Sequence, residues 1–165
     1  MENEKPDLLF LLSGPEPQRS IFEKIIIEEL AKNPEQKAVI LRGLPGKRDD
    51  ISSLPNVIMH SHLPDDEMTS QIRSAKLVIC RPGYSTLMDL FTLGRGAVLV
   101  PTPGQTEQEY LANYHSGNPS FISIRQSEFK LDKAAEAGFR LQSPENAKSD
   151  QELLTSNIGK LMDKL

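Results

Sequence analysis

The sequence has no Trp, a single Cys and few aromatic residues of any kind. With 5% aromatic residues, aliphatic side chains must form most of the core. The lone Cys80 excludes a disulfide within the chain and is typical of a reducing compartment. No apolar run approaches the ~20 residues that a membrane-spanning helix needs, and the start, MENEKPD, does not resemble a signal peptide. We therefore expect a cytoplasmic protein.

The sequence also lacks a block of basic residues. Its formal net charge is -4 and its isoelectric point is about 5.4, so nucleic acid is not expected as a partner. A length of 165 residues fits one domain, residues 1–165, and is enough to bury a sizeable core.

Short apolar runs alternate with helical patterns along the chain. Residues 21–30 and the segment after residue 64 have helical spacing, a short helix is expected around residues 132–137, and spaced leucines predict an amphipathic helix over residues 153–165. The alternation indicates an α/β fold, a Rossmann-like three-layer sandwich with a mostly parallel sheet of about six strands. The expected strands are Asp7–Leu12, Ala38–Leu41, Val57–Met59, Leu77–Cys80, Ala97–Val100 and, at an edge, Phe121–Ile124.

Three loops at the carboxyl ends of expected strands lead into helices: SGPEPQR (13–19), RPGYST (81–86) and PTPGQTEQ (101–108). Ligands of parallel sheets bind at this edge, and the free N–H groups of a helix start suit a phosphate. Gly14 and Gly83 would let the backbone approach such a ligand closely. The turn after Cys80 is therefore a candidate phosphate cradle, and Asp89 a candidate acceptor for hydroxyl groups of the same ligand.

A second interpretation of these loops is purely structural. Thr86 and Asp89 have the spacing of a capping box, as do Thr106 and Glu109. Spacing alone favours capping, because capping is common and phosphate turns are rare. The sequence has neither a G-x-G-x-x-G nor a G-x-x-x-x-G-K-[ST] motif. The pair His60 and His62 lacks a third ligand, so we expect no metal site and no cofactor.

Two linked motifs resemble the C-terminal domain of glycosyltransferase family 28. VICRPGYSTLMDL (78–90) is similar to the family's strand, Arg-x-Gly turn and following Thr and acid. VLVPTPGQTEQEYLANY (98–114) is similar to its next strand, Pro and Gln-x-Tyr helix. The resemblance covers nearly the whole chain in strand order, with its specific motifs between about residues 60 and 115. It implies one half of a GT-B fold.

The resemblance also implies a donor site. Its diphosphate turn would be formed around Gly83, its ribose-binding acid would be Asp89, and Arg81 would either approach the diphosphate or form a salt bridge. The helix after residue 105 would contact the donor sugar, with its polar side chains on one face. The complete set of expected substrate-binding residues is Gly14, Leu63, Asp65, Arg81, Gly83, Ser85, Thr86, Asp89, Gln105, Gln108 and Glu109.

The implied activity is transfer of a hexose, N-acetylglucosamine first among the candidates, from a UDP-sugar to an acceptor hydroxyl without a metal ion. No nucleophile with a partnering base is visible, so no catalytic residue is expected in this chain. The base is expected on an N-terminal acceptor domain, in cis or as a separate subunit, so the isolated chain should be inactive and the complete enzyme peripherally associated with membranes. Two alternatives stay open: half of a nucleotide-sugar hydrolase or epimerase, and a non-catalytic nucleotide-binding module.

Overall fold

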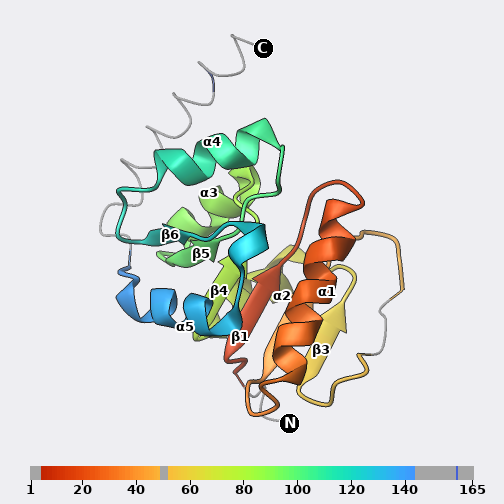
Figure 1. The fold of residues 1–165 in the computed structure, drawn as a ribbon. Helices are drawn as coiled ribbons and strands as arrows, with labels where there is room; N and C mark the ends of the chain where they lie inside the picture. Colours follow the sequence, from red (N-terminus) through yellow and green to blue (C-terminus); the bar gives the residue numbers. More distant parts are fainter. Residues whose placement is uncertain (1–4, 49–51, 144–158, 160–165) are drawn as a thin grey trace.

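Six parallel strands form one sheet in the order β3-β2-β1-β4-β5-β6 (Figure 1). The computed structural model describes residues 5–48, 52–143 and Gly159, so the expected helix over residues 153–165 falls almost wholly outside the described residues. The mostly parallel sheet expected from the apolar runs is confirmed. The strands are β1 (Leu8–Leu11), β2 (Ala38–Leu41), β3 (Val57–His60), β4 (Leu77–Cys80), β5 (Ala97–Leu99) and β6 (Phe121–Ser123).

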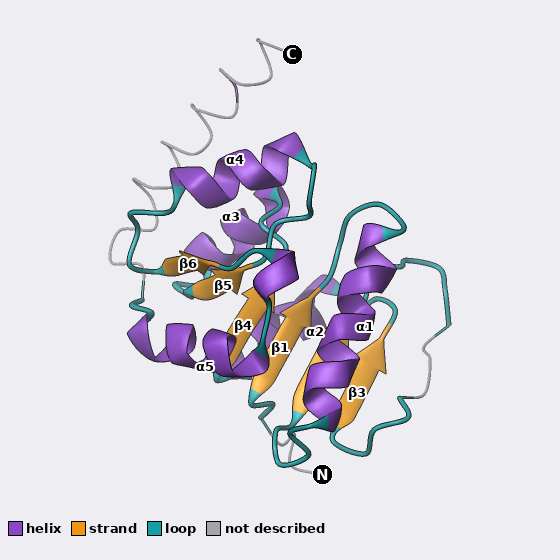
Figure 2. Ribbon diagram, viewed as in Figure 1, coloured by secondary structure: helices purple, strands orange, loops and turns teal. Residues whose placement is uncertain are grey.

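Helices cover both faces of the sheet and make three layers (Figure 2). The helices are α1 (Gln18–Ala31), α2 (Asp65–Ser74), α3 (Tyr84–Thr92), α4 (Thr106–Tyr114) and α5 (Leu131–Arg140), with a 3-10 turn at Gln126–Glu128. One buried cluster joins the sheet to α1 and α5, and a second joins it to α2, α3 and α4. The short helix expected around residues 132–137 is the centre of the longer α5. Across the described residues, no helix combines the length and apolarity needed to cross a membrane.

Strand β1 shows why the apolar runs were recognisable as strands. Leu8 and Phe10 pack in the cluster under α1 and α5, whereas Leu9 and Leu11 pack in the cluster under α2, α3 and α4. A strand covered on both faces needs apolar residues at every position, and β1, β2 and β4 are buried throughout. At the end of β4, Cys80 is fully buried, which raises the pKa of its thiol to about 12.

The strand order places the binding edge. Strands β1 and β4 are neighbours at the centre of the sheet. Strands β2 and β3 follow on the side of β1, and β5 and β6 follow on the side of β4. The crevice at such a reversal is the usual ligand site of an open α/β sheet. The loops after β1, β4 and β5 meet there.

The side chain of Glu29, on α1, forms hydrogen bonds with the start of α5. Its Oε2 accepts the backbone N–H of Leu131 at 3.0 Å, and its Oε1 lies 2.8 Å from Lys32 Nζ and 3.3 Å from Lys130 Nζ. Glu29 is 7% exposed. The hydrogen bond from Lys32, together with those from Leu131 and Lys130, lowers the pKa of Glu29 to about 2 against the opposing effect of burial.

Replacement of Glu29 by Gln should therefore destabilise the fold at neutral pH by about 1–3 kcal/mol, the scale of a lost charged hydrogen-bond partner. Because the folded pKa lies below the ordinary 4.5, this stabilisation is complete above about pH 4.5 and is lost as the pH falls towards 2. Urea unfolding of both proteins between pH 7 and pH 2.5 should show the difference shrinking with acid. Glu28→Gln on the exposed side of α1 should change stability by less than about 0.5 kcal/mol at every pH.

Candidate functional site

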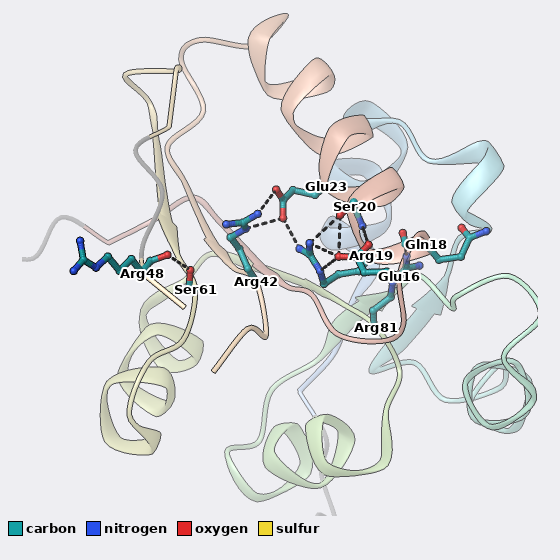
Figure 3. A network of polar contacts seen from close by, with 9 residues as sticks. All are labelled: Glu16, Gln18, Arg19, Ser20, Glu23, Arg42, Arg48, Ser61 and Arg81. Carbon is teal, nitrogen blue, oxygen red and sulfur yellow. Dashed lines mark hydrogen bonds and ion pairs between the residues drawn. The ribbon is translucent and has the colours of Figure 1, made fainter. Parts of the chain in front are cut away.

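A network of charged side chains holds the loop after β1 (Figure 3). Arg19 donates to Glu16 through Nε at 2.8 Å and to Glu23 through Nη1 at 2.7 Å, and Arg42 donates to Glu23 through Nε at 2.9 Å. Glu16 also accepts the backbone N–H of Ser20 at 3.2 Å. A carboxylate of the chain itself thus occupies the first turn of α1, where the sequence suggested a place for phosphate.

The turn after β4 is arranged differently. Gly83 is the extended residue before α3, and the helix begins at Tyr84, so Ser85 and Thr86 lie inside its first turn. In the described part of the chain, no side chain caps this helix. The prediction that Thr86 and Asp89 form a capping box is therefore wrong. The backbone N–H groups of Ser85 and Thr86 lie at the positive end of the helix dipole, which suits an anion.

A pocket of about 180 Å³ opens beside this turn. It brings together Leu63, Ser85, Thr86 and Asp89 from the expected site. A side chain built on Gly83 would meet no atom within 4 Å, so that glycine faces open space at the same turn. The remaining lining comes from the ends of β1 and β2, from the loops after β1, β2 and β3, and from α2: Leu11, Leu12, Ser13, Leu41, Gly43, His62, Met68 and Ile72.

The carboxylate of Asp89 at this pocket lies in an unfavourable electrostatic environment. The side chain of Asp89 is partly buried, and this burial, followed by the nearby negative charge of Asp65, raises the pKa of Asp89. The negative form of Asp89 is thus disfavoured in the chain by itself. Hydroxyl groups that donate hydrogen bonds to Asp89 would relieve that penalty.

A second group of expected residues meets across the loops after β1 and β5. Gly14 has a φ of 99°, a conformation that favours glycine. Its nearest neighbours are the side chains of Thr102, Gln105 and Gln108. Gln108 is 4% exposed, and its Oε1 accepts the backbone N–H of Thr102 at 2.8 Å. Thr102 was not among the expected residues, because it stands between two prolines and its sequence context indicates only a loop.

The structure separates Glu109 from Gln108. Glu109 is exposed, its Oε1 accepts the backbone N–H of Gly104 at 3.0 Å, and it lines a different pocket, beside Pro101. The spacing of Gln105, Gln108 and Glu109 predicted one shared helix face. In the structure Gln105 is the residue before α4, and Gln108 is buried near Gly14, whereas Glu109 contacts Gly104. Thr106 and Glu109 do not form a capping box, because the residue before α4 is Gln105 and no side chain among the described residues caps this helix.

Arg81 takes neither of the two places considered for it, beside a diphosphate or in a salt bridge to a carboxylate. Its side chain is fully buried and donates to Val100 O at 2.9 Å, Gln18 O at 3.2 Å and Gln126 Oε1 at 2.6 Å. The guanidinium carbon lies 4.4 Å from the centre of the Phe22 ring. Arg81 therefore has no exposed surface for a diphosphate. Its hydrogen bonds instead connect the end of β4 to α1, to the residue after β5 and to the 3-10 turn. Burial lowers its pKa to about 10, so it stays positively charged at neutral pH.

Taken together, the edge offers three kinds of chemistry side by side. The start of α3 can hold an anion, Asp89 can accept from hydroxyls, and the carboxamides of Gln105 and Gln108 can bind polar groups. Within the described ranges, no three His, Cys, Asp or Glu side chains are grouped so that they could hold a metal ion.

Comparison with known proteins finds a matching family model and similar sequences for this chain. A model described as "Glycosyltransferase family 28 C-terminal domain" matches residues 18–163. A UDP-N-acetylglucosamine--N-acetylmuramyl-(pentapeptide) pyrophosphoryl-undecaprenol N-acetylglucosamine transferase from Methylorubrum extorquens (strain PA1) is 28% identical over 145 residues. The match covers 82% of this chain and 39% of that relative, so the chain spans about two fifths of its length.

Solved structures share the fold at lower identity. CalG4, the calicheamicin glycosyltransferase, superposes with a TM-score of 0.66 at 22% identity, over 93% of this chain and 40% of its own. MurG from Acinetobacter baumannii gives a TM-score of 0.52 at 19% identity, over 94% of this chain and 54% of its own. These likenesses support the Rossmann-like α/β fold.

Proposed function

Since this chain belongs to the family of glycosyltransferase family 28 C-terminal domains, we propose that it is the donor-binding half of a two-domain glycosyltransferase. It has the Rossmann-like architecture of one half of a GT-B fold. The proposed donor is UDP-N-acetylglucosamine, because the M. extorquens relative is named for that donor. The proposed reaction transfers the sugar to an acceptor hydroxyl.

The pocket beside α3 is the proposed place of the uridine and diphosphate. The segment around Leu63 would meet the uracil, and Asp89 would accept hydrogen bonds from the ribose hydroxyls. The N–H groups of Ser85 and Thr86 would hold the diphosphate. As the bond to the sugar breaks, negative charge grows on the departing UDP, and the same N–H groups and helix dipole would stabilise it without a metal ion.

The proposed acceptor site lies on a second, N-terminal domain, supplied in cis or as a separate subunit. The acceptor in the name of the M. extorquens relative is linked to undecaprenol, a lipid. A complete enzyme acting on such an acceptor would work at a membrane surface as a peripheral protein. Its general base would also belong to the N-terminal domain.

The observation that carries this proposal is the pocket itself, where Ser85, Thr86 and Asp89 meet at the reversal point of the sheet. Titration of the chain with UDP should shift the backbone amide resonances of residues 12–14, 62–65 and 83–89. Perturbation confined to the amino edge of the sheet, or none at millimolar UDP, would contradict the proposal.

Asp89→Asn is the matched variant for this titration. It should weaken UDP binding by about 1–3 kcal/mol through loss of a charged acceptor. The melting temperature of the free protein should not fall, because the change removes a negative charge that burial and Asp65 disfavour. The control is Asp66→Asn, at the exposed position after Asp65, and it should leave the affinity for UDP unchanged. A variant that loses stability but binds UDP as before would assign Asp89 a structural role.

A further inference from the structure

One wall of the pocket proposed for the nucleotide is the segment at the end of β2. Leu41 and Gly43 both line that pocket, whereas Arg42, which stands between them, does not. Successive side chains of extended backbone point in opposite directions. The guanidinium of Arg42 accordingly extends away from the pocket and reaches Glu23 on α1 (Figure 3). The same short segment thus faces the pocket on one side and α1 on the other.

The contact between Arg42 and Glu23 is a two-point ion pair. Arg42 Nε donates to Glu23 Oε2 at 2.9 Å, and its Nη2 donates to Glu23 Oε1 at 3.1 Å. The side chains of Arg42 and Glu23 are 13% and 16% exposed, so salt and water screen this pair only weakly. Arg19 donates to the same Oε2 at 2.7 Å and orients the carboxylate from its own helix. Two bonds between a planar guanidinium and a carboxylate fix their relative orientation as well as their distance.

The wall is also in contact with the segments on either side of it. A Cβ atom built on Gly43, which has a φ of 66°, would lie 2.5 Å from the backbone oxygen of Leu12, another residue of the pocket. Leu44 N donates to Ser61 O at 2.7 Å, directly before the lining residue His62. The segment therefore sits between the loops after β1 and β3, and its position affects the shape of the whole pocket.

We propose that Glu23 is a positioning residue for the nucleotide pocket, because its paired bonds with Arg42 hold residues 41–43 in the place that UDP requires. This inference rests on the proposed function, since it takes that pocket as the UDP site. Glu23 does not line the pocket and acts on the ligand only through Arg42 and the wall. A wall that is already held in place loses less conformational freedom when the ligand binds, which favours affinity.

The test compares Glu23→Gln with Glu29→Gln. Both changes replace a carboxylate of α1 by a carboxamide of the same shape and remove ion pairs, but Glu29 contacts the start of α5 instead of the pocket wall. Each full chain is titrated calorimetrically with UDP at a temperature at which circular dichroism shows it to be folded. The dissociation constant should rise about 5- to 20-fold in Glu23→Gln and stay within about twofold in Glu29→Gln.

Two further measurements follow the path from Glu23 to the pocket. Arg42→Gln removes the same pair from its other side and should weaken UDP binding to a similar degree, so it tests the inference even where Glu23→Gln does not fold. The double variant should bind UDP within about twofold of the weaker single variant, because both changes remove one shared contact. In free Glu23→Gln, the amide resonances of residues 41–44 should shift, whereas those of Ser85 and Thr86 should not.

The opposite results are equally specific. Equal weakening in Glu23→Gln and Glu29→Gln would show that Glu23 only stabilises the fold. Unchanged affinity in Glu23→Gln or Arg42→Gln, or a double variant whose effect is the product of the two single effects, would show that the pair does not position the wall. Each of these results overturns the inference alone. Failure of the unaltered chain to bind UDP would overturn the proposed function and this inference with it.

Discussion

Purified residues 1–165 are expected to produce no detectable glycoside from UDP-N-acetylglucosamine, whichever lipid-linked or glycan acceptor is offered. Transfer to a hydroxyl profits from a base that removes the acceptor's proton. The side chains next to Gly14 belong to Thr102, Gln105 and Gln108. They carry one hydroxyl and two carboxamides, and none of these groups is a base at neutral pH. Addition of an N-terminal acceptor domain, fused or as a separate subunit, should restore turnover, measured as radiolabelled sugar in the acceptor.

Release of free sugar from the donor is measured in the same assay. A complete enzyme that releases sugar to water faster than to every acceptor would favour the hydrolase alternative. Robust transfer by the isolated chain would place the base within these residues. Glu109→Gln and His62→Gln would then be the first variants to compare, because each side chain lines a pocket at the carboxyl edge.

Arg81→Met should lower the free energy of unfolding by about 2–4 kcal/mol, the largest loss expected of a single substitution near the site. The change removes the bonds to Val100 O, Gln18 O and Gln126 Oε1, and the buried acceptors on Val100 and Gln126 that lose their donor cost about 1–3 kcal/mol each. Relief from burying a charge offsets part of that loss. Urea unfolding measures the difference.

Two further variants separate the contribution of the guanidinium shape from that of the charge. Arg81→Lys keeps the charge but lacks the planar fork that reaches several acceptors, so it should recover only part of the lost stability. Arg73→Met, at an exposed position on α2, should stay within about 0.5 kcal/mol of the unaltered chain. An Arg81→Met protein as stable as its parent would show that the three hydrogen bonds contribute nothing net.

The strands were predictable because a parallel sheet covered on both faces requires unbroken apolar runs. The run at Leu77–Cys80 was located without error, and that at Asp7–Leu12 was one residue too long at each end. Residues 126–140 gave a weaker signal, because α5 is held largely by contacts with distant parts of the chain. The bond from Leu131 to Glu29 spans 102 residues and has no local sequence signature.

The sequence was least informative about the site where the direction of a side chain decides what it contacts. Arg81 follows Ile79 at the period of two that a strand imposes, and Ile79 packs in the cluster under α1, so the interior position of Arg81 was available from the pattern. Gln108 and Glu109 both have the spacing that brings them to the face of Gln105, but the first accepts from Thr102 and the second from Gly104, which the spacing alone does not specify. The role of Glu16 was not available from the pattern, because its contacts with Arg19 and Ser20 depend on the path of the whole loop.

The burial of Cys80 has a practical consequence for spectroscopy of this chain. It is the sole thiol of the sequence, it is fully enclosed, and its pKa of about 12 leaves almost no reactive thiolate at neutral pH. A cysteine introduced at the exposed position Glu107, in the first turn of α4, can therefore take a fluorescent or spin label without prior removal of Cys80. Motion of the loop after β5 can then be followed in a protein whose core is untouched.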